Sequence, residues 1–218
     1  MSEFCGLCDI KACEAGDAAN YPPACPSRCA VVTDALEQYR GDADLRIAYN
    51  AALTEWEGYC RLTRIEETVL FFKKAGFRRI GIAYCGGFRQ EMKVVGRVFA
   101  HHKFDIYPVV CKCGGIPKEE IGMSDDFGKT RPGSFEAMCN PIGQAAYLND
   151  METEYNVLLG LCVGHDSLFL RYSKAPVTVL AVKDRVCGHA PMAPVYLADG
   201  YYRRKLFPEN DVPETDNR

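Results

Sequence analysis

Residues 156–169 read NVLLGLCVGHDSLF, and this stretch shows how the second half of the chain is organised. A short apolar run ends at Cys162, and an amphipathic segment begins three residues later at His165. A buried strand that leads directly into a helix has this pattern. The stretch therefore predicts one strand–helix unit, with a thiol at the carboxyl end of the strand.

The same alternation extends to both sides of this unit. Asn140 and Pro141 have the residue types of a helix start, Asn as the cap and Pro in the first turn. The predicted strands cover residues 78–85, 105–111, 154–162 and 175–184, and the predicted helices between them cover 88–104, 140–150 and 165–173. Strands that alternate with helices predict an α/β fold with a parallel sheet flanked by helices.

The first part of the chain has a different character. Residues 1–30 contain five cysteines and three prolines but almost no apolar periodicity, so they cannot bury enough apolar surface to fold alone. The apolar spacing from residue 31 onward is helical. We expect four parts, namely a cysteine-rich metal-binding module (1–30), a helical segment (31–76), the α/β sheet domain (77–207) and a polar tail (208–218).

Composition excludes several classes of function. The chain of 218 residues carries a net charge of −3, without the basic excess of a nucleic-acid-binding protein. Its apolar runs are too short to span a membrane. The start, MSEFCGLCDIKAC, lacks the basic and apolar regions of a signal peptide. We therefore expect a cytoplasmic protein that binds neither nucleic acid nor membranes.

Twelve cysteines are the strongest chemical signal in the chain. In a reducing compartment such cysteines serve metal binding or redox chemistry rather than structural disulfides. A free cysteine can also be a small buried apolar residue, and this is the interpretation for Cys60, at the end of a predicted helix.

Several thiols are predicted to meet at one edge of the sheet. Cys85, Cys111 and Cys162 each follow a predicted strand, and the carboxyl ends of parallel strands form the site-bearing edge of such sheets. Cys139 precedes a predicted helix start, and helix N-termini favour thiolates. These four cysteines form a predicted iron–sulfur site, with Cys187 as the first reserve ligand. Cys113 is expected to point away, because alternate residues of an extended chain face opposite sides.

The N-terminal cysteines have the spacing of a metal site. Cys5 and Cys8 form a C-x2-C pair, and Cys13 and Cys25 complete the first choice of four ligands, with Cys29 as the alternative fourth. Four thiolates suit either zinc or a 4Fe–4S cluster. A second thiol-rich site in the same chain favours iron–sulfur here.

Polar residues near the predicted sheet edge suggest further roles. His165 is the candidate catalytic residue, as a general acid or as a hydrogen-bond donor to a cluster sulfide. Asp166 is expected to cap the helix that begins beside it. Lys183 and Arg185 follow the fourth strand, where they could hold an anion. No nucleotide-binding glycine motif follows the first strand.

Three segments carry a resemblance to a known family. FEAMCNPIGQAAYLN (135–149), GLCVGHDSLF (160–169) and SKAPVTVLAVKDRVCGH (173–189), together with the N-terminal cysteine pair, resemble the DUF1847 family of predicted metal-binding proteins. The resemblance implies a zinc site at the N-terminal cysteines and no particular activity. It matches the four N-terminal ligands and the four sheet-edge cysteines, whereas Cys29 and Cys113 are additional in this chain.

The leading hypothesis is a redox-active iron–sulfur protein. Its N-terminal cluster would pass electrons to the sheet edge, where a small molecule is converted or sensed, and an electron-transfer protein would be its partner. One alternative is a non-enzymatic, zinc-stapled protein that binds a ligand or a partner. Another is a thiol enzyme that uses Cys85 or Cys162. The sequence leaves open whether the protein is an enzyme and what its oligomeric state is.

Overall fold

The computed structural model describes residues 5–208, which form two compact units that divide between Thr63 and Arg64. We describe each unit by itself. The predicted metal-binding module and polar tail each lie partly outside the described residues. The boundary between the units falls inside the segment predicted as helical, 31–76.

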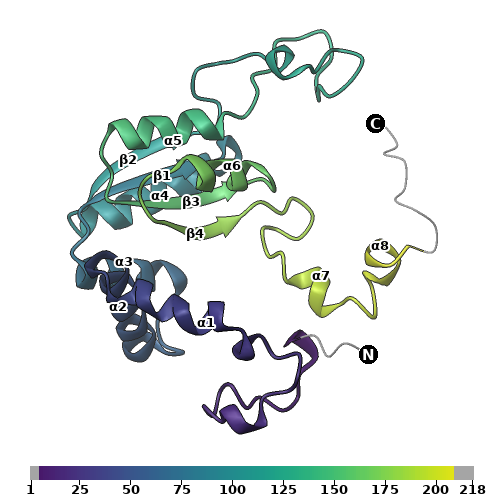
Figure 1. Cartoon of the computed structure of the whole chain (residues 1–218). Helices are drawn as coiled ribbons and strands as arrows, with labels where there is room; N and C mark the ends of the chain where they lie inside the picture. Colours follow the sequence, from purple (N-terminus) through teal and green to yellow (C-terminus); the bar gives the residue numbers. More distant parts are fainter. Residues whose placement is uncertain (1–4, 209–218) are drawn as a thin grey trace. The chain divides into compact units, whose positions relative to one another are not determined.

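The first unit consists of short helical turns and one long helix, α2 (Figure 1). Its elements are η1 (Cys5–Leu7), η2 (Ala18–Asn20), η3 (Pro26–Arg28), α1 (Ala30–Asp34), η4 (Ala35–Arg40) and α2 (Asp42–Gly58). Asp42 and Asp44 lie in the first turn of α2, where negative charge stabilises the helix dipole. The apolar side chains Leu45, Tyr49 and Trp56 are exposed. The apolar spacing of α2 predicted the helix, but these side chains of its apolar face are exposed.

The second unit confirms the predicted α/β fold with a four-stranded parallel sheet, in the order β2-β1-β3-β4 (Figure 1). The strands are β1 (Arg79–Tyr84), β2 (Asp105–Val110), β3 (Tyr155–Leu161) and β4 (Val177–Val182). The helices are α3 (Arg64–Ala75), η5 (Gly86–Phe88), α4 (Arg89–His101), η6 (Lys118–Ile121), α5 (Pro141–Asp150), α6 (His165–Tyr172), α7 (Ala193–Tyr196) and α8 (Arg203–Leu206). Helix α5 packs against β1 and β2, and α6 packs against β3 and α5.

The core of this unit lies around the sheet. One part is aromatic, and its buried centre is Phe72, whose ring contacts those of Phe77, Phe99 and Phe104. A second cluster contains buried side chains of β1, β2, β3, α5 and α6, namely Ala83, Val109, Cys111, Ala145, Leu148, Leu158, Leu161 and Phe169. Cys85, Cys113 and Cys139 pack against this second cluster. The thiols therefore continue the apolar core at the carboxyl edge of the sheet.

Two further findings concern the predictions on metals and membranes. Within residues 5–208, no three or more His, Cys, Asp or Glu side chains are arranged to hold a single metal ion. The N-terminal metal-binding module therefore stays a prediction. In the same range, no helix is both long and apolar enough to cross a membrane.

Candidate functional site

The carboxyl edge of the sheet presents three cysteines and a lysine. Cys85, Cys111 and Cys162 directly follow β1, β2 and β3, and Lys183 follows β4. The backbone hydrogen bonds of the sheet extend one residue beyond the end of β1. The amide of Cys85 donates to the Leu159 carbonyl at 3.0 Å. The amide of Cys111 likewise donates to the Tyr84 carbonyl at 2.8 Å. The sheet itself therefore fixes the backbone positions of these thiols.

Cys139 reaches the same edge through the start of α5. The Asn140 side chain accepts a hydrogen bond from the Gly143 amide at 2.8 Å, which caps α5 as predicted. The Asn140 amide donates to the carbonyl of Cys111 at 2.7 Å. This contact holds Cys139 beside Cys111, and their Sγ atoms lie 3.9 Å apart. The sequence did not determine the position of Cys139, because a long loop separates it from Cys111. The structure places the two thiols side by side.

Cys111 is the central member of a group of three thiols, which we call the thiol triad: Cys85, Cys111 and Cys139. Its side chain is 3% exposed, and its Sγ accepts a hydrogen bond from the Gly86 amide at 3.3 Å. It also forms side-chain hydrogen bonds with both other members of the triad. Cys111 therefore lies between the thiol that follows β1 and the thiol that precedes α5.

The members of the triad shift each other's pKa in opposite directions. The hydrogen bond with Cys111 lowers the pKa of Cys85 to about 5, aided by the Gly87 amide and by Lys183. The hydrogen bond with Cys111 also lowers the pKa of Cys139 to about 5, aided by Lys112 and His165. The two neighbouring sulfurs and burial raise the pKa of Cys111. The contacts within the triad therefore favour the ionised form of Cys85 and Cys139 and the protonated form of Cys111.

Cationic side chains surround the triad. The Nζ atom of Lys183 lies 4.1 Å from the ring centroid of Phe88 and hydrogen-bonds to Cys85. The Nζ atom of Lys112 donates to the Ala137 carbonyl at 2.5 Å and acts on Cys139. The charges of Cys85 and Cys139 also act on Arg185, whose own pKa is raised chiefly by its hydrogen bond to Cys162. The site is therefore electropositive, apart from its own thiolates.

The fourth predicted cluster ligand is engaged differently. Arg185 Nη2 donates a hydrogen bond to Cys162 Sγ at 3.3 Å, so this sulfur pairs with a cation rather than with a thiol. His165 begins α6 and contributes electrostatically to the triad through Cys139. The predicted cap role of Asp166 is wrong, because Gly164 occupies the cap position. Asp166 lies in the first turn, where its carboxylate accepts from the Ser167 amide at 2.8 Å.

Two of the remaining cysteines contact oxygen atoms rather than other thiols. Cys113 Sγ lies 3.9 Å from the Asn140 carbonyl oxygen, and Cys187 Sγ lies 3.4 Å from the hydroxyl of Tyr202. Cys60 is exposed, so its predicted place in the core is wrong. It has a φ of +54°, in the left-handed region, and follows the end of α2 directly rather than lying on its buried side.

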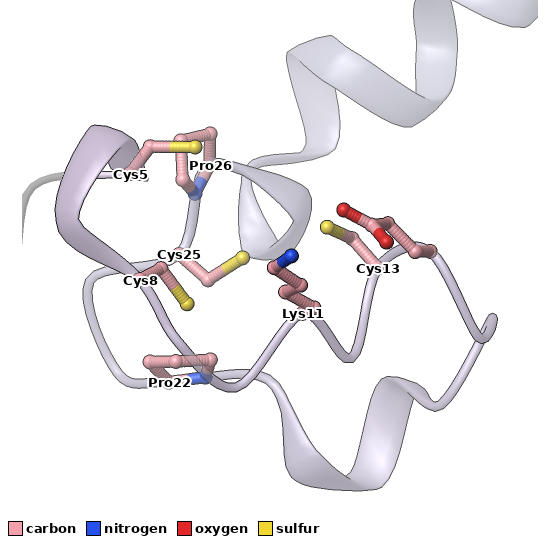
Figure 2. A pocket seen from close by; sticks show the side chains of 8 residues that line it. Cys5, Cys8, Lys11, Cys13, Pro22, Cys25 and Pro26 are labelled. Atoms are coloured by element: carbon pink, nitrogen blue, oxygen red, sulfur yellow. The ribbon is translucent and has the colours of Figure 1, made fainter.

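The first unit gathers the four predicted N-terminal ligands around one pocket of about 170 Å³ (Figure 2). The lining residues are Cys5, Cys8, Lys11, Cys13, Glu14, Pro22, Cys25 and Pro26. Figure 2 shows Lys11 among the thiols, with the side chains of Cys13 and Cys25 directed toward it and Cys5 beside Pro26. Cys29 does not line this pocket and is exposed before α1.

Sequence reasoning missed Lys112 and Gln144. Lys112 lies between two cysteines just past a strand end, and this position is the signal that could have marked it. Gln144 is fully buried, and its Nε2 donates to the carbonyls of Val109 and Tyr84 at 2.8 and 3.2 Å. It ties α5 to the ends of β1 and β2. No local pattern distinguishes it from a surface glutamine.

Comparisons with known proteins give a family but no activity. The family described as "Protein of unknown function (DUF1847)" matches residues 25–180. An uncharacterized protein of the archaeon Methanocaldococcus jannaschii is 39% identical over 203 residues, which cover 93% of this chain and 97% of that protein. No solved structure is significantly similar to the chain. The matched family region contains the whole thiol triad.

Proposed function

We propose that this chain, which belongs to the DUF1847 family of unknown function, is a redox-active, cysteine-dependent metalloprotein. Because the family gives no activity, the proposal rests on the side chains of this protein. The observation that carries this proposal is the thiol triad. Two partly exposed thiols of lowered pKa beside one buried thiol form a reactive arrangement, which simple core packing of cysteines does not require.

The triad supports chemistry on a small molecule. Cys85 and Cys139 are partly exposed, whereas Cys111 is buried, so a reactant reaches the two ionised sulfurs first. His165, which acts on Cys139, is the proposed proton donor. The predicted iron–sulfur cluster on Cys85, Cys111, Cys139 and Cys162 stays a prediction. It would require the sulfurs of the triad to separate and Cys162 to release Arg185.

The first unit supports a metal centre of iron–sulfur type. Four cysteines line its pocket, and thiolates are the ligands that such clusters prefer. The four thiols line one cavity of about 170 Å³, where a group bound by several cysteines would have room. Lys11 would balance part of the thiolate charge.

Metal analysis of the intact chain tests this proposal. The chain is purified without oxygen, and its iron, zinc and acid-labile sulfide are measured for wild type and for Cys8→Ser and Cys29→Ser. We expect iron and sulfide in the wild type, loss of both in Cys8→Ser, and retention in Cys29→Ser, the matched control outside the pocket. Zinc without sulfide would overturn the iron–sulfur assignment, and a chain without any metal would overturn the metal centre itself.

A further inference from the structure

We propose that Cys111 and Cys139 form a reversible disulfide and that this pair reduces small disulfides that carry negative charge. This inference rests on the proposed redox function and names the substrate class of the triad. It does not depend on the metal centre of the first unit.

Geometry supports a disulfide between these two residues. Their sulfurs lie 3.9 Å apart, and a bond of about 2.05 Å requires only side-chain movement if the backbones are close. The backbones are close, because the carbonyl of Cys111 accepts the amide of Asn140 at 2.7 Å. Cys139 directly precedes Asn140 in the chain, so this hydrogen bond holds the backbones of the two cysteines next to each other.

Exposure assigns a different role to each sulfur. Cys139 is partly exposed and acts as the attacking thiolate, whereas Cys111 is 3% exposed and acts as the resolving thiol. Cys85 is hydrogen-bonded to Cys111 and orients the resolving thiol. Cys113, only two residues from Cys111, contacts the Asn140 carbonyl and takes no part in the exchange.

The exchange balances without a further reactant. The Cys139 thiolate attacks one sulfur of a substrate disulfide R–S–S–R′, which forms Cys139–S–S–R′ and releases R–S⁻. Cys111 then attacks the Cys139 sulfur, which forms the Cys111–Cys139 disulfide. Its proton leaves with the second product as R′–SH. Two electrons pass from the protein sulfurs to the substrate, and an external dithiol restores the Cys111–Cys139 pair to its reduced form by the reverse exchange.

Charge around the triad defines the class of substrate. The positive charge of Lys112 lowers the pKa of Cys139, and that of Lys183 lowers the pKa of Cys85. Arg185 donates a hydrogen bond to Cys162. The carboxylate of Asp184 is turned to the backbone amides of Val186 and Cys187, both at 2.9 Å, and so is engaged within its own loop. A disulfide with carboxylate or phosphate groups is therefore attracted, whereas a cationic disulfide is repelled.

Disulfide mapping of the full chain tests the pairing. Reduced protein is treated with oxidised glutathione, its free thiols are alkylated, and it is digested with trypsin and a glutamate-specific protease. These proteases place Cys85, Cys111, Cys113, Cys139 and Cys162 on separate peptides. We expect one dominant link, between Cys111 and Cys139, which a reductant reverses. The link should persist in Cys113→Ser, the matched control, and disappear in Cys139→Ser.

Charge preference is tested with three disulfides. The rates of thiol release are compared for oxidised glutathione, neutral hydroxyethyl disulfide and cationic cystamine. At low salt we expect oxidised glutathione to react about tenfold faster than cystamine, with the difference reduced at high salt. The fast phase should be absent in Cys139→Ser. Equal rates for all three disulfides would overturn the substrate class while leaving the pairing intact.

The outcomes separate this inference from the proposed function. Links distributed over many cysteines, or a Cys111 that stays reduced, would overturn the disulfide even if metal is present. Loss of iron from Cys111→Ser would overturn it as well, because Cys111 would then be a cluster ligand. A Cys111–Cys139 link in a metal-free chain would support the inference and leave the metal centre without support.

Discussion

Gly160 lies near the carboxyl end of β3, where any side chain would meet the ring of Phe88. It has a φ of +71°, and the register between β3 and β4 shifts across it, between Leu159 and Leu161, so it forms a bulge just before the end of β3. A Cβ atom placed there would lie 2.1 Å from Cε2 and 2.2 Å from Cδ2 of Phe88. Phe88 is 3% exposed and packs against Lys183 and His189, so its ring cannot move freely.

The predicted cost of Gly160→Ala has two parts. An alanine with a left-handed backbone costs about 1–2 kcal/mol. Forcing extra volume into a packed core costs about 1–3 kcal/mol more. Together these give a loss of about 2–5 kcal/mol, a large part of the ~5–15 kcal/mol that stabilises a typical domain. The displaced Phe88 ring should also disturb Lys183, which lies 4.1 Å from it.

Gly96→Ala is the matched control in the same unit. Gly96 lies within α4, and a Cβ there would meet only Cε of Met92 at 3.4 Å and Cδ1 of Ile106 at 3.5 Å. Both are flexible side-chain ends at van der Waals contact, so alanine should stabilise the helix by about 0.5–1 kcal/mol.

Urea denaturation followed by far-UV circular dichroism measures both variants. Tryptophan fluorescence would not serve, because the single tryptophan, Trp56, belongs to the other unit. We expect a lower unfolding midpoint for Gly160→Ala and a slightly higher one for Gly96→Ala. A Gly160→Ala chain as stable as the wild type would refute the argument that Phe88 and the bulge exclude a side chain.

Three other predictions concern single contacts. The alkylation rate of Cys85 should reach half its plateau near pH 5, and Cys111→Ala should move this midpoint to higher pH, because the hydrogen bond with Cys111 is the largest cause of the lowered pKa; a wild-type midpoint above pH 8 would contradict this. The hydrogen bond from Lys118 lowers the pKa of Glu136 from 4.5 to about 2. The ionised Glu136 side chain therefore stabilises the surrounding loop fully above pH 4.5, and this stabilisation is lost as the pH falls toward 2. Pepsin cleavage of that loop should accelerate across this range, and Glu136→Gln should weaken the pH dependence. Asn140→Ala should cost about 1 kcal/mol in urea denaturation and Asn140→Asp much less, because only the second keeps an acceptor for the helix N-terminus; equal losses would argue against the cap.

Local sequence patterns were sufficient for the elements of the sheet. The apolar runs that end at Cys85, Cys111 and Cys162 predicted strands, and the observed ones end one residue before each thiol. Asn140 and Pro141 predicted the start of α5 because capping depends on adjacent residues. These predictions succeeded because burial and helix capping produce residue patterns that extend over only a few neighbouring positions of the chain.

What the sequence by itself determined is therefore the α/β fold and the presence of thiols at strand ends. Tertiary structure alone decided which thiols meet. Cys139 joins Cys111 across a loop of 27 residues between them, while Cys162 pairs with Arg185 instead. Such partners are set by how α5 and the segment after β4 pack on the sheet. The sulfur contacts, and the pKa values that follow from them, depend on distances that spacing along a chain does not encode.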